Sequence, residues 1–198
     1  MKVEPKTALI SVWDKTGLIE FGKGLQRLGI EIIATGGTAK LLKENDVPVT
    51  AVADYADYPE MLDGRVKTIQ PKIQGGILAL RNNHNHMEQL KAHNIKPIDI
   101  VVFNLYPFEQ VVSKGAQMDE ALENIDIGGP TSIRAAAKNF KDVIVVIDSE
   151  DYPWIIKELE ENGDLIFQQR LKLATKVFRH TSEYDRVIQK YLKGQNER

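Results

Sequence analysis

The chain has 198 residues, and its 26 Lys and Arg against 28 Asp and Glu give a formal net charge of −2. This near balance argues against a sequence-independent nucleic-acid binder, which needs a surplus of positive charge to displace phosphate counterions. No cysteine is present, which excludes disulfides, thiol nucleophiles and cysteine-ligated metals.

Short β-branched runs alternate with longer segments of helical period. The expected strands are 8–12, 31–35, 49–53, 99–105 and 142–148, and the expected helices are 18–28, 38–45, 86–94, 118–124 and 130–139. This alternation is typical of an α/β fold with a parallel sheet covered on both faces. After residue 151 apolar residues recur at helical spacing, which predicts a helical C-terminal extension over about 151–192. We expect one domain over 1–198, with a core over about 7–150.

Ligands of parallel sheets bind beyond the carboxyl ends of the strands, in loops that lead into helices. Four such loops have unusual compositions, namely SVWDKTG, ATGGT, NLYPF and IDIGGPTS. Because the carboxyl ends of parallel strands share one edge of the sheet, we expect these loops to form a single site.

The loop ATGGT has the features of an anion site. Its backbone N–H groups and the dipole of the following helix attract negative charge, and Thr35 and Thr38 add hydroxyl donors. The alternative is a plain turn that needs a positive φ at Gly36 or Gly37. Lys15, in the loop SVWDKTG, would bring a positive charge to the same anion.

The segment MLDGRVKTIQPKIQGGILA, residues 61–79, shows neither strand alternation nor a clean helical period. Long loops in compact domains are usually functional. The functional interpretation is a phosphate clamp made by Arg65 with Thr68, and Lys67 near a reacting carbonyl. A solvated basic face is the alternative.

Polar side chains follow the very apolar strand 99–105. Asn104 and Tyr106 lie at its end, and buried amide and phenol groups need hydrogen-bond partners. Tyr106 could instead simply cap the core. Asp126 comes just before a Gly-Gly turn.

The helix that follows Asp126 carries a pair of basic residues. We expect Pro130 at its first position, with Arg134 and Lys138 on one face at i and i+4. Pro130 and Lys138 are separated by about 12 Å along a straight helix. Asp126 and Lys138 therefore need not touch, but could face a ligand from two sides.

The four histidines do not predict a metal site. His84 and His86 lie in a polar loop without a further ligand at suitable spacing, and His93 lies near the end of the next helix. We interpret His180, in the helical tail, as structural.

Six motifs in order resemble the IMP cyclohydrolase half of the bifunctional AICAR transformylase/IMP cyclohydrolase family. They are SVWDKTGLIEF, ATGGTAKLL, DGRVKTIQPKIQGGILA, NLYPFE, IDIGGPTSIRAAAKN and HTSEYDRVIQKYL, and the resemblance covers residues 7–192. It implies a methylglyoxal-synthase-like fold, a three-layer α/β/α sandwich with a mainly parallel sheet. The implied reaction closes 5-formamidoimidazole-4-carboxamide ribonucleotide (FAICAR) to IMP with loss of water, the last step of de novo purine synthesis. No cofactor and no metal are implied.

The resemblance also assigns residues. It implies catalytic roles for Lys67, Tyr106, Asp126 and Lys138. It implies substrate-binding roles for Ser11, Lys15, Thr16, Thr35, Gly36, Gly37, Thr38, Arg65, Thr68, Asn104, Ile127 and Gly128. The sequence departs from the family at Gln70 and Gln74, where His is common, and at Trp13, where Ser or Tyr is usual.

The implied partners are the nucleotide substrate FAICAR and its product IMP, a second copy of the chain in a homodimer, and a transformylase domain or protein. Neither nucleic acid nor membrane is expected as a partner. The sequence holds neither a signal peptide nor the roughly 20 apolar residues of a membrane span, so we expect a cytoplasmic protein. Two alternatives are a methylglyoxal-synthase-like phosphate lyase and a non-catalytic nucleotide-sensing module on the same fold.

Overall fold

A five-stranded parallel sheet forms the centre of the computed structural model, which describes residues 4–196. Its strands are β1 (Thr7–Ser11), β2 (Glu31–Ala34), β3 (Thr50–Ala51), β4 (Ile100–Phe103) and β5 (Ile144–Val146), in the spatial order β3-β2-β1-β4-β5. The pairing is parallel throughout, with Ile10 beside Ala34 of β2 and Val102 of β4. Because both faces are covered, these strands are continuous apolar runs.

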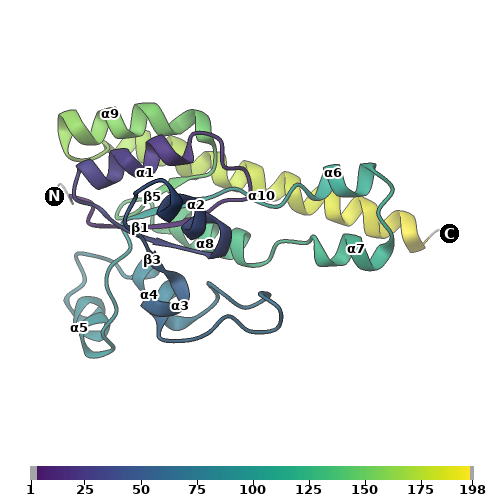
Figure 1. Ribbon diagram of the computed structural model, residues 1–198, viewed down its shortest axis with the longest axis horizontal. Helices are drawn as coiled ribbons and strands as arrows, with labels where there is room; N and C mark the ends of the chain where they lie inside the picture. Colours follow the sequence, from purple (N-terminus) through teal and green to yellow (C-terminus); the bar gives the residue numbers. More distant parts are fainter. Residues whose placement is uncertain (1–3, 197–198) are drawn as a thin grey trace.

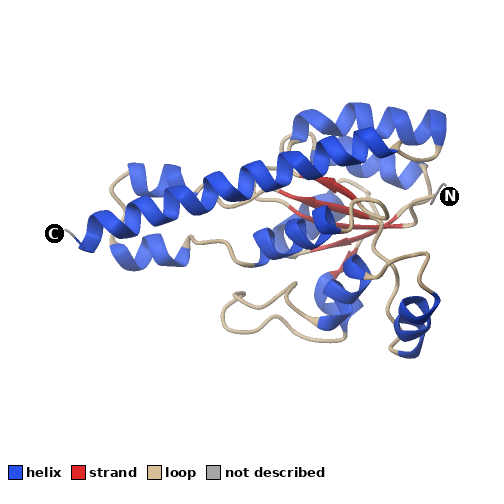
Figure 2. Cartoon of the chain, turned by 180° about the vertical axis from the view of Figure 1, so that it is seen from behind, coloured by secondary structure: helices blue, strands red, loops and turns tan. Residues whose placement is uncertain are grey.

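Helices cover the two faces of the sheet, as expected (Figure 1; Figure 2). In chain order they are α1 (Leu18–Arg27), α2 (Gly36–Glu44), α3 (Val52–Ala56), α4 (Pro71–Leu78), α5 (His84–Ala92), α6 (Phe108–Ser113), α7 (Met118–Glu123), α8 (Gly128–Lys138), η1 (Ser149–Asp151), α9 (Tyr152–Asn162) and α10 (Phe167–Asn196). α1 packs against α9 on one side, and α8 packs against α4 on the other. The prediction of a three-layer α/β/α sandwich is confirmed.

The expected elements differ from the observed ones in four places. The expected strand 49–53 is a two-residue strand followed by α3, and the loop expected over 61–79 contains α4. α6 was not expected either. Pro130 is the third residue of α8 rather than the first, since the helix begins at Gly128. Its ring is tolerated there because the first turn has no intrahelical acceptors for its N–H groups.

The helical C-terminal extension is part of the same hydrophobic core as the sheet. Buried residues of α9 and α10, among them Ile155 and Val177, belong to this core. The far half of α10 runs past the sheet and lies alongside α6 and α7 (Figure 1). No helix within residues 4–196 is long and apolar enough to cross a bilayer. Residues 1–3 and 197–198 of the expected 1–198 domain lie outside the described residues.

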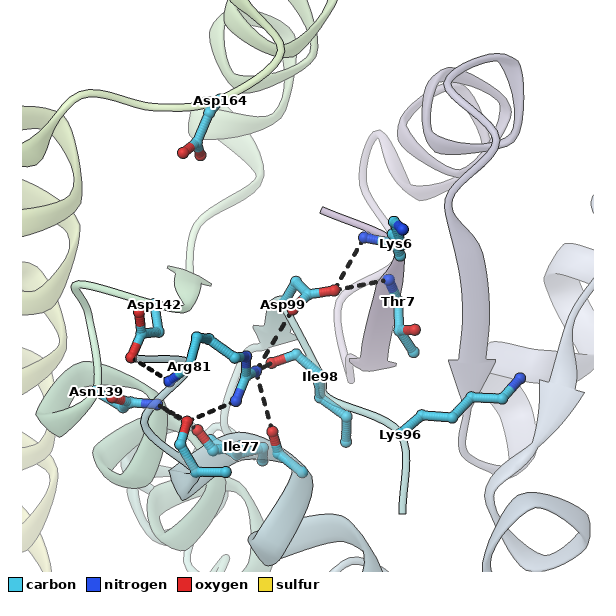
Figure 3. A network of polar contacts seen from close by, with 12 residues as sticks. Lys6, Thr7, Ile77, Arg81, Lys96, Ile98, Asp99, Asn139, Asp142 and Asp164 are labelled. Atoms are coloured by element: carbon cyan, nitrogen blue, oxygen red, sulfur yellow. Dashed lines mark hydrogen bonds and ion pairs between the residues drawn. The ribbon is translucent and has the colours of Figure 1, made fainter. Parts of the chain in front are cut away.

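A buried ion pair joins the segment that follows α4 to the amino ends of β1 and β4, as Figure 3 shows. Nη2 of Arg81 lies 3.4 Å from Oδ1 of Asp99 and donates to the carbonyl oxygen of Ile98 at 2.8 Å. Oδ2 of Asp99 accepts from the backbone amides of Lys6 and Thr7 at 2.9 and 3.2 Å. These contacts satisfy the Asp99 carboxylate and Nη2 of Arg81, whereas the buried Nε of Arg81 has no hydrogen-bond partner among the described residues. They fix the segment that follows α4.

Candidate active site

A cavity of about 810 Å³ lies beyond the carboxyl ends of β1, β2 and β4. The four unusual loops and the segment 61–79 converge on it, as the topology predicts. The predicted residues that line it are Ser11, Lys15, Thr35, Gly36, Gly37, Thr38, Arg65, Lys67, Thr68, Asn104, Tyr106, Asp126, Ile127 and Gly128. Residues that the sequence analysis assigned no role also line it, namely Val12, Asp63, Gly64, Ile69, Phe103, Asp119, Leu122, Glu123, Ile125 and Gly129.

The first turn of α2 forms one end of the cavity and is open to an anion. Thr35 is the N-cap residue, but its side chain makes no capping bond to the helix. Its Oγ1 instead lies 2.6 Å from Oγ of Ser11. Nothing lies within 4 Å of the position that a Cβ would take at Gly36 or Gly37. An anion could therefore approach this turn closely enough to accept from the N–H groups of the helix N-terminus.

Lys15 approaches the same turn from β1. Its Nζ lies 3.3 Å from Oγ1 of the buried Thr38 and also contacts the carbonyl oxygen of Val12. Thr38 in turn accepts from the amide of Val12 at 3.1 Å, which ties α2 to the loop after β1. Burial lowers the pKa of Lys15, and the nearby Asp14 carboxylate only partly opposes this. A bound anion would offset that desolvation cost.

Thr16, which the resemblance assigns to substrate binding, makes local contacts in the loop before α1. Its amide and its hydroxyl both donate to Oδ1 of Asp14, at 2.9 and 2.7 Å. These two bonds lower the pKa of Asp14 and close a turn before α1. Among the described residues, Thr16 is not one that lines the cavity, and its implied substrate-binding role stays a prediction.

Asn104 holds the loop after β1 in place. Its Oδ1 accepts from the amides of Trp13 and Asp14 at 2.5 and 3.0 Å, and its Nδ2 donates to the carbonyl oxygen of Asp14 at 2.9 Å. The loop in turn presents Trp13, which lines the cavity with 51% of its surface exposed. An exposed indole at a cavity wall is a stacking surface for a planar ring.

A strained hairpin presents Lys67 to the cavity. Met61 and Val66 exchange two backbone bonds, of 3.1 and 3.2 Å, around a turn in which Leu62 and Asp63 have φ of 53° and 54°. Such left-handed conformations cost about 1 kcal/mol or more per non-glycine residue. Gly64 has φ 86°, and a Cβ there would lie 2.7 Å from Cε of Lys67. A side chain at position 64 would therefore be strained by the backbone and would displace the flexible end of Lys67.

The ammonium group of Lys67 forms a long ion pair with the carboxylate of Glu60. Its Nζ lies 3.6 Å from Oε2 of Glu60, and both side chains are about one-third exposed (34% and 36%). This long, solvated contact is weak. It leaves Lys67 able to turn toward a ligand.

Gln70 and Gln74 support the backbone that carries Lys67. Nε2 of Gln70 donates to the carbonyl oxygen of Lys67 at 2.8 Å. Nε2 of Gln74 donates to the carbonyl oxygen of Thr68 at 3.1 Å and lies 3.2 Å from Oγ of Ser132. Gln70 and Gln74, which stand where His is common in the family, thus retain a hydrogen-bond donor but have no group that titrates near neutral pH.

Asp126 lies opposite the hairpin in a partly buried turn. Its Oδ1 accepts from the amide of Gly129 at 2.8 Å, and a Cβ at Gly129 would lie only 2.6 Å from its Oδ2. Burial raises the pKa of Asp126, while the amides of Gly129 and Tyr106 and the charge of Lys67 act in the opposite direction. Tyr106 is 46% exposed and lines the cavity, so it does not cap the core.

Lys138 does not line the cavity among the described residues, and its implied catalytic role stays a prediction. It is exposed in the last turn of α8, about 15 Å along the helix from Gly128. Arg134 on the same face lies over the ring of Phe178 at 5.5 Å, so this face is turned toward α10.

Two of the histidines, His84 and His86, make local contacts and do not line the cavity. His86 accepts from the amide of Leu80 at 3.2 Å, and His84 lies 3.8 Å from Glu88 on the surface. Within residues 4–196, no group of three or more His, Asp or Glu is arranged to hold a metal ion.

Two family models match the chain. The MGS-like domain model matches residues 17–131, and the AICARFT/IMPCHase bienzyme model matches residues 136–198. The bifunctional purine biosynthesis protein PurH of Persephonella marina is 56% identical over 187 residues, which are 94% of this chain and 36% of that protein. PurH of Listeria monocytogenes is 54% identical over 188 residues, or 94% of this chain and 37% of that protein.

The fold has a close match among solved structures. The crystal structure of ForH superposes with a TM-score of 0.81 at 38% sequence identity, covering 93% of this chain and 97% of that one. The chain spans just over one third of the length of the PurH relatives. It belongs to the MGS-like domain family and corresponds to the IMP cyclohydrolase domain of the AICARFT/IMPCHase bienzyme.

Proposed function

We propose that this chain closes FAICAR to IMP with loss of water. The observation that carries the proposal is that Lys67, Tyr106 and Asp126 line the same cavity as the open first turn of α2. One end of this cavity suits a 5′-phosphate and the other offers a cation, a phenol and a carboxylate. The purine-biosynthesis names of the relatives support the same reaction.

Binding of the phosphate orients the reacting groups. The amides of Gly36 and Gly37 and the ammonium group of Lys15 would hold it, with Ser11, Thr35 and Thr38 completing the wall. FAICAR carries its nucleophile and its electrophile on one ring. Holding them in an attack conformation can therefore supply much of the rate acceleration.

Ring closure needs one group that stabilises the developing negative charge and one group that accepts and returns a proton. The carboxamide nitrogen attacks the formyl carbon, and the ammonium group of Lys67 stabilises negative charge that develops on the formyl oxygen. The Asp126 carboxylate takes the proton that the nitrogen loses, with Tyr106 orienting the carboxamide. Protonated Asp126 returns this proton to the former formyl oxygen, which becomes a hydroxyl group. The formamido nitrogen then loses its own proton as the ring C=N bond forms and the C–O bond breaks, and the departing hydroxyl takes up that proton, so that one water molecule leaves. A raised pKa of Asp126 suits this exchange.

The remaining assignments are parts of the same proposal. We propose a single domain over the whole chain, supported by one core shared between the sheet and α10. A transformylase partner domain is supported by the length of the PurH relatives. We also propose a homodimer and a cytoplasmic location, on the basis of the family resemblance.

The test supplies purified FAICAR to chelator-treated protein without folate or nucleoside triphosphate, and follows IMP by absorbance. IMP formation is expected, together with no release of phosphate from dihydroxyacetone phosphate. Phosphate release without IMP would favour the phosphate lyase. Binding of IMP without turnover of either compound would favour a nucleotide-sensing module.

A further inference from the structure

One side chain of α10 reaches the turn that carries Asp126. The hydroxyl of Tyr184 accepts from the backbone amide of Asp126 at 2.9 Å and donates to the carbonyl oxygen of Asn124 at 3.4 Å. Tyr184 is 58 residues away in the sequence and is not one of the residues that line the cavity. It therefore contacts the site from behind, through the backbone.

The Tyr184 ring is itself held by packing. It is 9% exposed and meets the ring of Phe108 edge-on, with centroids 6.4 Å apart. Phe108, at the start of α6, is 1% exposed. Burial raises the pKa of Tyr184 to about 12, so its hydroxyl remains protonated and able to donate at neutral pH.

We propose that Tyr184 is a positioning residue that fixes the turn from Asn124 to Asp126 so that the Asp126 carboxylate faces the substrate. The backbone amide of Asp126 is fixed by Tyr184, and its Oδ1 is fixed by the amide of Gly129 at 2.8 Å. These two bonds hold both the backbone and the carboxylate of Asp126. The proposal rests on the proposed function, in which Asp126 moves the proton.

α10 offers a matched control for the test. Tyr191 lies two turns after Tyr184 and also packs edge-on against Phe108, with centroids 5.7 Å apart. Tyr184→Phe and Tyr191→Phe each remove one hydroxyl from this aromatic cluster, but only the first removes a bond to the Asp126 turn. Comparison of the two variants separates positioning of Asp126 from packing of α10.

We expect Tyr184→Phe to lower kcat about 10- to 100-fold, the range for a small displacement of a reacting group, with KM and IMP affinity within about twofold of wild type. Tyr191→Phe should keep kcat within about twofold of the wild-type value. Equal kcat in both variants and the wild type, or equal losses in both variants, would overturn the proposal. So would a Tyr184→Phe variant that loses IMP affinity as much as kcat.

A second measurement applies if Tyr184→Phe does not fold. Hydrogen exchange of the wild-type protein should show protection at the amide of Asp126, because Tyr184 accepts its proton. Exchange at the rate of an unstructured chain would overturn the proposal. An inactive wild-type protein with a protected Asp126 amide would contradict the proposed function and leave the contact itself in place.

Discussion

The guanidinium group of Arg65 is paired with the carboxylate of Glu123 across the mouth of the cavity. Nε of Arg65 lies 3.3 Å from Oε2 of Glu123, and Nη2 contacts the other oxygen. The contact joins the hairpin to the end of α7. Both side chains are more than half exposed, at 66% and 58%, so the pair is solvated and contributes little to stability.

This pairing predicts that Glu123 competes with an anionic ligand for Arg65. Glu123→Gln should tighten IMP binding by up to about fivefold, since an exposed pair of this kind is worth about 0–1 kcal/mol. Glu120→Gln, on the same helix but outside the pair, is the control for the change in net charge. Calorimetric titration with IMP measures both. Equal tightening in the two variants would show that only the overall charge matters, and weaker binding in Glu123→Gln would show that the pair shapes the site.

Lys67→Met should lower kcat by at least about 100-fold, as loss of one group that stabilises an oxyanion does. IMP affinity should fall much less, because Lys67 lies on the hairpin and not at the first turn of α2. Lys72→Met is the control, since the ammonium group of Lys72 lies 5.8 Å from the ring centroid of Tyr55 and not at the cavity. Equal losses in kcat and in IMP affinity would place Lys67 in the phosphate clamp instead.

The sheet could be predicted from the sequence because its strands are buried on both faces and read as continuous apolar runs. α4 could not, although Ile73 and Ile77 stand four residues apart and are fully buried. Gly75 and Gly76 have low helix propensity and obscured the pattern. Packing explains Gly76, since a Cβ there would lie 2.7 Å from the carbonyl oxygen of Lys96. Tertiary contact thus overrides local preference at this helix.

Much of the cavity wall could be predicted because it lies in loops at the ends of strands, although Thr16, in the loop after β1, does not line the cavity. Lys138 lies at the far end of a helix, and no local pattern states which face of α8 meets α10. Glu123 and Tyr184 were not identified because each acts through a contact with a distant segment, 58 residues away in both cases. Periodicity and motif spacing carry no information on such pairs.

Asp126→Asn should abolish most activity, by at least about 100-fold, and raise the melting temperature at neutral pH. Burial raises the pKa of Asp126, so the folded protein binds its proton more tightly than the unfolded chain does. The ionised carboxylate therefore costs stability above the folded-state pKa, and this cost disappears as the pH falls through that value.

The gain in melting temperature from Asp126→Asn should accordingly be present at pH 7–8 and vanish below about pH 4, where an unfolded carboxyl is also protonated. Asp185→Asn, an exposed change on α10, is the control and should show no such pH dependence. A variant that is less stable than wild type at neutral pH would mean that the bond from Gly129 outweighs the cost of burial.

Trp13 should report ligand binding and contribute to it. The chain has two tryptophans. Trp13 is half exposed at the cavity wall, whereas Trp154 donates from its indole to Oδ1 of Asp151 at 3.0 Å, among residues that do not line the cavity. Saturating IMP should change the fluorescence of the Trp154→Phe variant as it does that of the wild type, and should leave the fluorescence of the Trp13→Phe variant unchanged.

Stacking of a base on an aromatic ring is worth about 1–3 kcal/mol, so Trp13→Ala should weaken IMP binding by about fivefold or more. A fluorescence change that persists in Trp13→Phe, with unaltered affinity in Trp13→Ala, would place the base away from this side chain and toward Tyr106.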